Sequence, residues 1–205
     1  ESDRGGVMKG LALYSQAQKL LEASGSLREI ARVHNNIGAV LFYEDMWDQA
    51  LEHYQKCLEL SERCGEVSTS AYALSNIGQI LGLKGEQERA LKYLDAAMGT
   101  FERLGDEYMC SSTLLGKGIV YRTARDWERS EQFFVEGIAL LKGLHMPREM
   151  AEARFEHGLA LKGKGDAAGA MKELEFARGE FERLGAARVL ARTERELKGL
   201  KTKKS

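Results

Sequence analysis

The sequence predicts an all-α protein built as an array of antiparallel helical hairpins with a 40-residue repeat. Four glycines, Gly38, Gly78, Gly118 and Gly158, are spaced by that period. Apolar residues recur at steps of three and four, which is typical of one face of a helix. Proline, which disrupts helix interiors, occurs only at Pro147. Together these observations favour a helical solenoid.

The residues around the four glycines repeat with the same period. One column holds small residues and a second, four positions later, holds bulky apolar residues. The small column is Gly10, Ala50, Ala90, Ser130 and Ala170, and the bulky column is Tyr14, Tyr54, Leu94, Phe134 and Leu174. Self-similarity at a fixed period is the sequence signature of stacked repeats.

The columns organise residues 1–205 as a single array of about ten helices. An unpaired helix is expected over about 7–24, hairpins over about 26–64, 66–104, 106–144 and 147–184, and a capping helix over about 186–200. A further glycine column, Gly25, Gly65, Gly105 and Gly185, falls where second helices end, the usual place for a left-handed residue. His145 interrupts that column.

The mid-helix glycines predict close helix packing, because each costs about 1 kcal/mol relative to alanine and needs a compensating contact. Within a hairpin we expect Gly38 to face Ala50 and Gly78 to face Ala90. At the N-terminal end the apolar face formed by Val7, Met8, Leu11 and Tyr14 lacks a hairpin partner. That face predicts either further chain upstream or self-association through the N-terminal helix.

Composition excludes several functional classes from the expectation. The 30 basic and 31 acidic residues give a net charge of −1, without the basic excess typical of nucleic-acid binding. No run of 18 apolar residues occurs, so no membrane association is expected. The three cysteines are too few and irregular for a disulfide framework, which favours a cytoplasmic location.

No catalytic constellation is apparent, and we expect a protein that is not an enzyme and uses no cofactor or metal. Gly158 and Gly163-Lys164 come close to a phosphate loop, but Gly165 stands where the loop needs Ser or Thr. His53 and Cys57 have metal-ligand spacing, but Cys57 occupies a small-residue column and is expected in the core.

The glycine, small and aromatic columns resemble the tetratricopeptide repeat family over essentially the whole chain. The unit is longer than the usual one of the family, which makes it similar to the branch of kinesin light chains and Leu-Gly-Asn-repeat adaptors. The resemblance implies a right-handed superhelix whose concave groove is lined by the first helix of each hairpin. It also implies a protein or peptide as the partner.

The family's groove positions map onto the first helices of the four hairpins. They are Arg32, Asn35, Asn36, Ala39, Phe42 and Tyr43; Tyr72, Ser75, Asn76, Gln79 and Leu83; Ser112, Leu115, Ile119 and Arg122; and Glu152, Phe155, Leu159 and Lys162. The carboxylate clamp of the chaperone adaptors is absent, because Ala39, Ser112 and Gly116 stand where polar or basic residues are required. Chaperone C-termini are therefore not expected as ligands.

Several of these positions allow two interpretations. Asn35, Asn36 and Asn76 are helix-unfavourable residues inside helices, so they contact either a ligand backbone or a neighbouring helix. Phe42 and Tyr43 beside Arg32 form either an anchor pocket or hairpin packing.

The main functional hypothesis is a non-catalytic scaffold or adaptor that holds an extended peptide or a partner helix in the groove. The alternatives are a self-association module and the regulatory or sensor part of a longer enzyme or transcription regulator.

Overall fold

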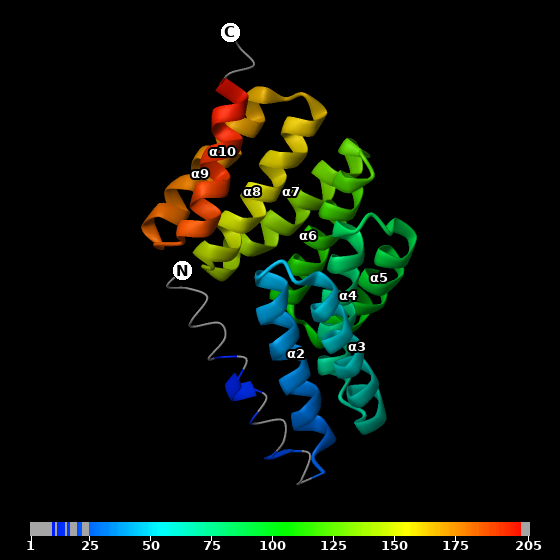
Figure 1. Ribbon diagram of the computed structural model, residues 1–205. Coiled ribbons are helices and arrows are strands. Elements are labelled where there is room, and N and C mark those ends of the chain that lie inside the picture. The colour runs from blue at the N-terminus through cyan, green and yellow to red at the C-terminus, as the bar shows by residue number, and fades with distance from the viewer. Residues whose placement is uncertain (1–9, 11, 15, 17–19, 22–24, 202–205) are drawn as a thin grey trace.

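Helices are the regular elements in the described part of the computed structural model, which comprises residues 10, 12–14, 16, 20–21 and 25–201. Within these residues the helices are α2 Leu27–Tyr43, α3 Trp47–Cys64, α4 Val67–Leu83, α5 Gln87–Leu104, α6 Glu107–Thr123, α7 Trp127–Leu144, α8 Pro147–Lys164, α9 Ala167–Arg183 and α10 Ala187–Lys201. Successive helices pair as antiparallel hairpins that stack along the array (Figure 1). The predicted all-α solenoid is confirmed.

Backbone turns follow the repeat as strictly as the helices do. Residues with positive φ lie between hairpins at Gly25, Gly65, Gly105, His145 and Gly185, and within hairpins at Asp45, Gly85, Arg125 and Gly165. His145, with φ +52°, therefore adopts the left-handed conformation that glycine provides elsewhere in its column. The conformation is imposed by the packing of the flanking helices even where the residue does not favour it.

Helix starts use local sequence signals in three of the later turns. Asp106, Asp126 and Asp166 each accept a hydrogen bond from the backbone amide three residues onward. Such caps satisfy amides that have no partner inside the helix. Asp106 also accepts a hydrogen bond from the Tyr72 hydroxyl at 3.3 Å, so this cap joins α6 to α4.

The mid-helix glycines pack under the bulky column of the next helix. A Cβ atom on Gly38 would lie 2.8 Å from the Tyr54 ring, and one on Gly78 would lie 2.7 Å from Leu94 Cγ. The Ala90 carbonyl oxygen also approaches the Gly78 position, at 3.1 Å. The expectation that Gly38 faces Ala50 was wrong, because the nearest side chain is Tyr54, one helical turn further on.

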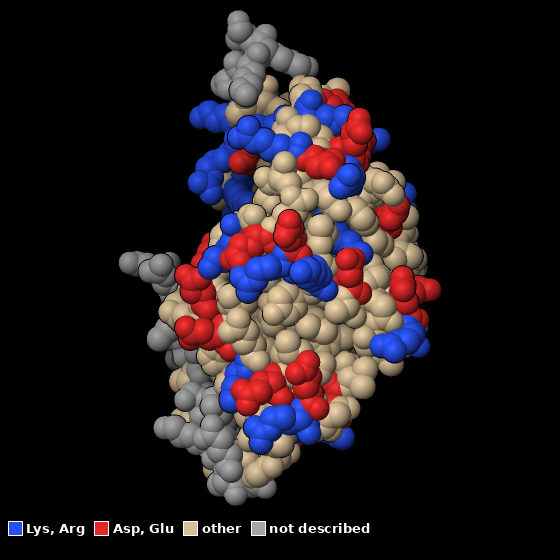
Figure 2. Space-filling view, turned by 90° about the vertical axis from the view of Figure 1, so that its right-hand side faces the viewer, with Lys and Arg blue, Asp and Glu red and all other residues tan. Residues whose placement is uncertain are grey.

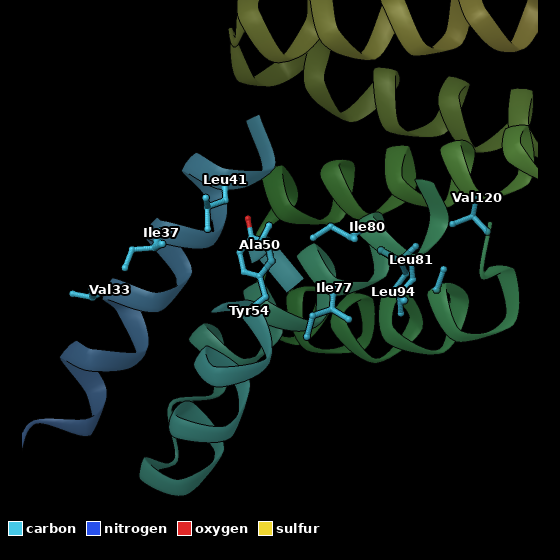
Figure 3. Close-up of a cluster of buried hydrophobic side chains, with 11 residues drawn as sticks. Val33, Ile37, Leu41, Ala50, Tyr54, Ile77, Ile80, Leu81, Leu94 and Val120 are labelled. Carbon is cyan, nitrogen blue, oxygen red and sulfur yellow. The ribbon is translucent and has the colours of Figure 1, made fainter. Parts of the chain in front are cut away.

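One hydrophobic core passes through three hairpins (Figure 3). Its buried members come from α2 to α6 and are Val33, Ile37, Leu41, Ala50, Tyr54, Ile77, Ile80, Leu81, Ala90, Leu94 and Val120. Because each hairpin shares its core with the next, no unit closes its own interior. This continuity is what makes the repeats depend on their neighbours.

The first helices of the hairpins form the inside of the array. Helices α2, α4, α6 and α8 contact one another in sequence, whereas within the described residues α3, α5, α7 and α9 make no comparable contacts among themselves. Helices that touch lie on the shorter path of a curved stack. We call the surface that α2, α4, α6 and α8 present to the inside of this curve the inner face.

The two ends of the array differ. Helix α10 buries Thr193, Leu197 and Leu200 against α9 and exposes its remaining polar side, as a capping helix must. The predicted opening helix lies largely outside the described residues, as do Val7, Met8 and Leu11. Of its described residues, Tyr14 packs against the core while Leu13 and Leu20 are exposed.

The surface charges are mixed over much of the face in Figure 2, where Lys and Arg lie beside Asp and Glu. Basic side chains gather towards the top of that view, next to the C-terminal residues. None of the described helices has the length and apolar character needed to span a bilayer.

Candidate binding site on the inner face

The predicted groove residues all lie on the four inner helices. Arg32, Asn36 and Tyr43 are exposed, Ser75 and Phe155 are buried, and the others are partly buried. The partly buried ones are Asn35, Ala39, Phe42, Tyr72, Asn76, Gln79, Leu83, Ser112, Leu115, Ile119, Arg122, Glu152, Leu159 and Lys162. Ser75 and Phe155 therefore offer almost no surface of their own.

The asparagines have different environments. The Asn76 side-chain amide donates to Asn35 Oδ1 at 3.3 Å, which joins α4 to α2. Asn36 is exposed and has no side-chain hydrogen bond within the described part of the chain. The helix-to-helix interpretation thus fits Asn35 and Asn76, and the ligand interpretation fits Asn36.

Uncharged groups continue across the next seam of the inner face. The Ser75 and Thr113 hydroxyls lie 3.4 Å apart, and the Gln79 amide donates to Ser75. A Cβ on Gly116 would meet Gln79 at 3.0 Å. The seams from α2 to α6 are therefore closely packed and neutral.

Ion pairs replace these groups further along the chain. Arg122 contacts Glu156 at 2.8 Å and Lys162 contacts Glu196 at 2.6 Å, each across a spacing of 34 residues. The Arg192 guanidinium lies 4.8 Å from the Phe155 ring centroid and 4.0 Å from Glu156. Glu156, Arg192 and Glu196 were not predicted, although the constant spacing of 34 would have identified the two carboxylates.

A group of aromatic and charged side chains gathers where the end of α2 meets the starts of α6 and α8. We call it the Tyr–Glu cluster and define it as Tyr43, Tyr108, Arg148, Glu149 and Glu152. Arg148 donates to Glu152 at 3.2 Å, and its guanidinium lies 5.7 Å from the Tyr43 ring centroid. The cation beside Tyr43 is thus Arg148, whereas Arg32 pairs with Glu29 at 3.3 Å.

Electrostatics confirm that these side chains share one environment. Burial raises the pKa of Glu152 above its ordinary value, against the opposing effect of Arg148. Burial, followed by the charge of Glu149, raises the pKa of Tyr108 to about 12. Tyr43 also has a raised pKa, through burial and then Glu152. Clustered groups with shifted pKa values are common at functional sites.

A contact between distant units borders this cluster. Arg188, near the start of α10, donates to the Tyr43 carbonyl oxygen at 2.6 Å and pairs with Glu44 at 3.5 Å and with Asp45. These partners are separated by 143 to 145 residues in sequence. The turn after α2 therefore reaches the last helix across the inside of the curve.

The remaining candidate motifs form no reactive site. Burial raises the pKa of Cys57 to about 12, so its thiol is protonated at neutral pH, and His53 instead contacts His34 at 3.0 Å. Residues 158–165 form the end of α8 and its turn, where Gly158 packs on Leu174. Within the described residues, no group of three or more His, Cys, Asp and Glu could hold a metal ion.

Two shallow hollows lie away from the inner face. One, of about 400 Å³, is lined by residues of α7, α8 and α9 and the turn between α7 and α8: Leu141, Lys142, His145, Met146, Pro147, Met150, Arg154 and Phe176. The other, of about 460 Å³, lies between α9 and α10. Neither contains a residue of the Tyr–Glu cluster.

Comparisons with known proteins agree with this architecture. Residues 29–103 match the tetratricopeptide repeat family model. No curated protein matches the sequence.

The chain is also similar to solved structures. It is similar to BtubC (BKLC) from P. vanneervenii, with 21% identity, TM-score 0.67, and coverage of 90% of this chain and 76% of that one. A Rap protein complexed with competence and sporulation factor gives 15% identity, TM-score 0.70, and coverage of 99% and 72%. A Podosopora anserina protein with kinesin light chain TPR-like repeats gives 10% identity, TM-score 0.60, and coverage of 90% and 91%.

Identities at this level establish the fold alone. The family model and the shared fold together confirm the resemblance predicted from the glycine and small-residue columns. The chain is a tetratricopeptide-type repeat protein, in which residues 29–103 match the family model itself and the later hairpins continue the same solenoid.

Proposed function

We propose that this protein is a non-catalytic interaction scaffold whose inner face binds an extended peptide or a helix of a partner protein. The observation that carries the proposal is the state of Asn36. It is exposed in the middle of α2, and its amide has no internal partner among the described residues. Asparagine is unfavourable inside helices, so such a residue calls for a compensating contact.

The chemistry of that side chain suits a polypeptide ligand. A carboxamide offers both a donor and an acceptor, as a peptide group does. The inner helices touch one another from α2 to α8, so their exposed side chains form one continuous strip. A Rap protein with the same fold was solved in complex with competence and sporulation factor, which supports a binding role for this type of array. In this proposal the protein acts as a cytoplasmic adaptor, in line with its free cysteines.

Peptide phage display against the purified protein tests the proposal. Peptides selected on the wild type are assayed against Asn36→Ala and against Gln55→Ala, a matched control on the exposed side of α3. We expect Asn36→Ala to weaken binding and Gln55→Ala to leave it unchanged, with equal helicity by circular dichroism. Equal binding by all three proteins would place the ligand on another surface.

Self-association is a second candidate, favoured by one observation. Leu13 and Leu20, seven residues apart on the opening helix, have 66% and 75% of their surface exposed. Two turns of helix bring such residues onto one face. Light scattering of the wild type and of Leu13→Gln/Leu20→Gln would show a concentration-dependent dimer only for the wild type. A wild type that stays monomeric at high concentration removes this candidate.

A further inference from the structure

The Tyr–Glu cluster already contains one seated cation. The Arg148 guanidinium lies 5.7 Å from the Tyr43 ring centroid and hydrogen-bonds Glu152, while 60% of its side chain remains exposed. A cation over an aromatic face with a carboxylate beside it is the arrangement that proteins use to recognise ammonium and guanidinium groups. The cluster therefore shows, with its own residue, the chemistry that it favours.

A second aromatic ring in the cluster has no such occupant. Tyr108 is 37% exposed, and within the described part of the chain no cation lies over its ring. The carboxylates of Glu149, Glu152 and Asp106 are close enough to raise the pKa of its hydroxyl. The Tyr108 surface thus repeats the aromatic and acidic surroundings of Tyr43.

The charge of this region is not balanced internally. Asp106, Glu149 and Glu152 are three carboxylates around Tyr108, against the single positive charge of Arg148. The neighbouring cation, Arg188, is engaged by Glu44 and Asp45 instead. An incoming positive charge would therefore be attracted, and an incoming carboxylate repelled.

We propose that a Lys or Arg side chain of the partner docks over the Tyr108 ring, between Glu149, Glu152 and Asp106. The inference rests on the proposed scaffold function and gives it a specificity element. It identifies the partner segment as one with a basic residue at the position that meets the start of α6 and α8. Tyr108, Glu149 and Glu152 are then binding residues, and Arg148 is an internal competitor for Glu152.

Short peptides can test this docking without knowledge of the partner. The probes are acetyl-Ala-Arg-Ala-amide and acetyl-Ala-Lys-Ala-amide, with the Gln and Glu peptides as matched controls. They are titrated against protein carrying ¹³C-labelled tyrosine, observed by NMR. We expect saturable shifts of the Tyr108 ring signal with the basic peptides only. Equal shifts with the Gln peptide, or no response of Tyr108 to the basic peptides, would overturn the proposal.

Variants separate docking from a merely structural role. Glu152→Gln and Tyr108→Leu should each weaken the basic probes by about tenfold, while Tyr108→Phe keeps the ring and should bind as the wild type does. Arg148→Gln should strengthen binding, because it removes a like charge and releases Glu152. Glu88→Gln, on the exposed surface of α5, is the matched control. Weaker binding by Arg148→Gln would contradict the assignment of Arg148 as a competitor.

The outcome is distinguishable from that of the scaffold proposal. If phage-selected peptides lose affinity for Asn36→Ala but lack basic residues and tolerate Glu152→Gln, the scaffold stands and the basic-residue site is refuted. If no peptide is selected although the Arg probe still shifts Tyr108, the cluster binds cations and the scaffold proposal is refuted. Basic residues enriched in the selected peptides, with loss on Glu152→Gln, support both.

Discussion

Hairpins α4–α5 and α8–α9 begin 80 residues apart in sequence and share the same frame. In each, a mid-helix glycine lies under a leucine: a Cβ on Gly78 would be 2.7 Å from Leu94 Cγ, and one on Gly158 would be 2.8 Å from Leu174 Cγ. Ala90 and Ala170 occupy equivalent fully buried positions. The contacts that set the distance between the two helices are therefore the same in both hairpins.

The remaining core positions of the two hairpins have different chemistry. Leu74, Ile77 and Tyr93 of the first correspond to Arg154, His157 and Glu173 of the second. Arg154 pairs with Glu173 at 2.8 Å, and His157 lies 3.9 Å from the same carboxylate. The comparison teaches that the glycine and small columns are fixed by shape. Positions between them accept ionisable groups where those groups can pair.

The largest expected effect comes from breaking the buried ion pair. Arg154→Leu leaves the Glu173 carboxylate, 12% exposed, without its guanidinium partner, and should lower the free energy of unfolding by about 2–4 kcal/mol. The double variant Arg154→Leu/Glu173→Tyr installs the pair found in α4–α5. It should return to within about 1 kcal/mol of the wild type, because both charges are gone. Urea unfolding followed by circular dichroism measures both. A double variant as unstable as the single one would show that the hairpins are not interchangeable here.

Filling the shared glycine positions should have equal effects in the two hairpins. Gly78→Leu and Gly158→Leu each force a side chain into an occupied site, and each should cost about 1–3 kcal/mol of stability. Thermal melts provide the comparison. Gly99→Ala is the control, since nothing lies within 4 Å of that position, and it should stabilise by about 0.5–1 kcal/mol. A Gly78→Leu variant that melts like the wild type would refute the packing described for the hairpins.

The buried histidine should give the second hairpin a pH dependence that the first lacks. Burial lowers the pKa of His157 below its unfolded value, although Glu173, Glu131 and Asp166 act in the opposite direction. The unfolded chain therefore binds a proton first as the pH falls. Stability declines below about pH 6.5, by no more than about 1.4 kcal/mol per pH unit for one group.

His157→Ile, which installs the residue of α4, should flatten this slope between about pH 6.5 and pH 5. His53, whose pKa is also lowered by burial, keeps part of it. Denaturant titrations at several pH values measure the slope. The exposed His145, replaced by Asn, is the control. An unchanged slope in His157→Ile would assign the effect to other groups.

The smallest expected effect is at the edge of the second hairpin, where Lys162 replaces the Gly82 of the first. Lys162 and Glu196 are each 30% exposed, so Lys162→Gln should cost only about 0.2–1 kcal/mol. That difference should vanish at 1 M salt, because screening acts within about 3 Å. Arg122→Gln, at a pair less than 20% exposed, should retain its effect at high salt. Equal salt dependence of the two variants would contradict the difference in burial.

Much of the fold could be predicted because the repeat keeps shape-determining residues in columns. Glycines at 65 and 105 predicted the left-handed helix ends that the structure contains. The partner of Gly38 was wrongly predicted because helical side chains lean towards the N-terminus. This lean moves the contact by one turn, from Ala50 to Tyr54.

The site was less accessible from sequence because it depends on curvature. Pairs between adjacent inner helices, such as Arg122 with Glu156, follow a fixed offset and could have been found from the sequence. The approach of Arg148 to Tyr43 depends on the small rotations between units summed over three hairpins. No periodicity in the chain encodes that sum.

The contact of Arg188 with the turn at Tyr43–Asp45 changes the mechanics of the array. In an open solenoid each repeat contacts only its neighbours, so the end units fray independently and the whole stretches like a spring. Here the last helix holds the first hairpin by charge-assisted hydrogen bonds. Fraying of α10 and loosening of α2 are therefore coupled. The spring is clasped at both ends, and its compliance depends on one arginine.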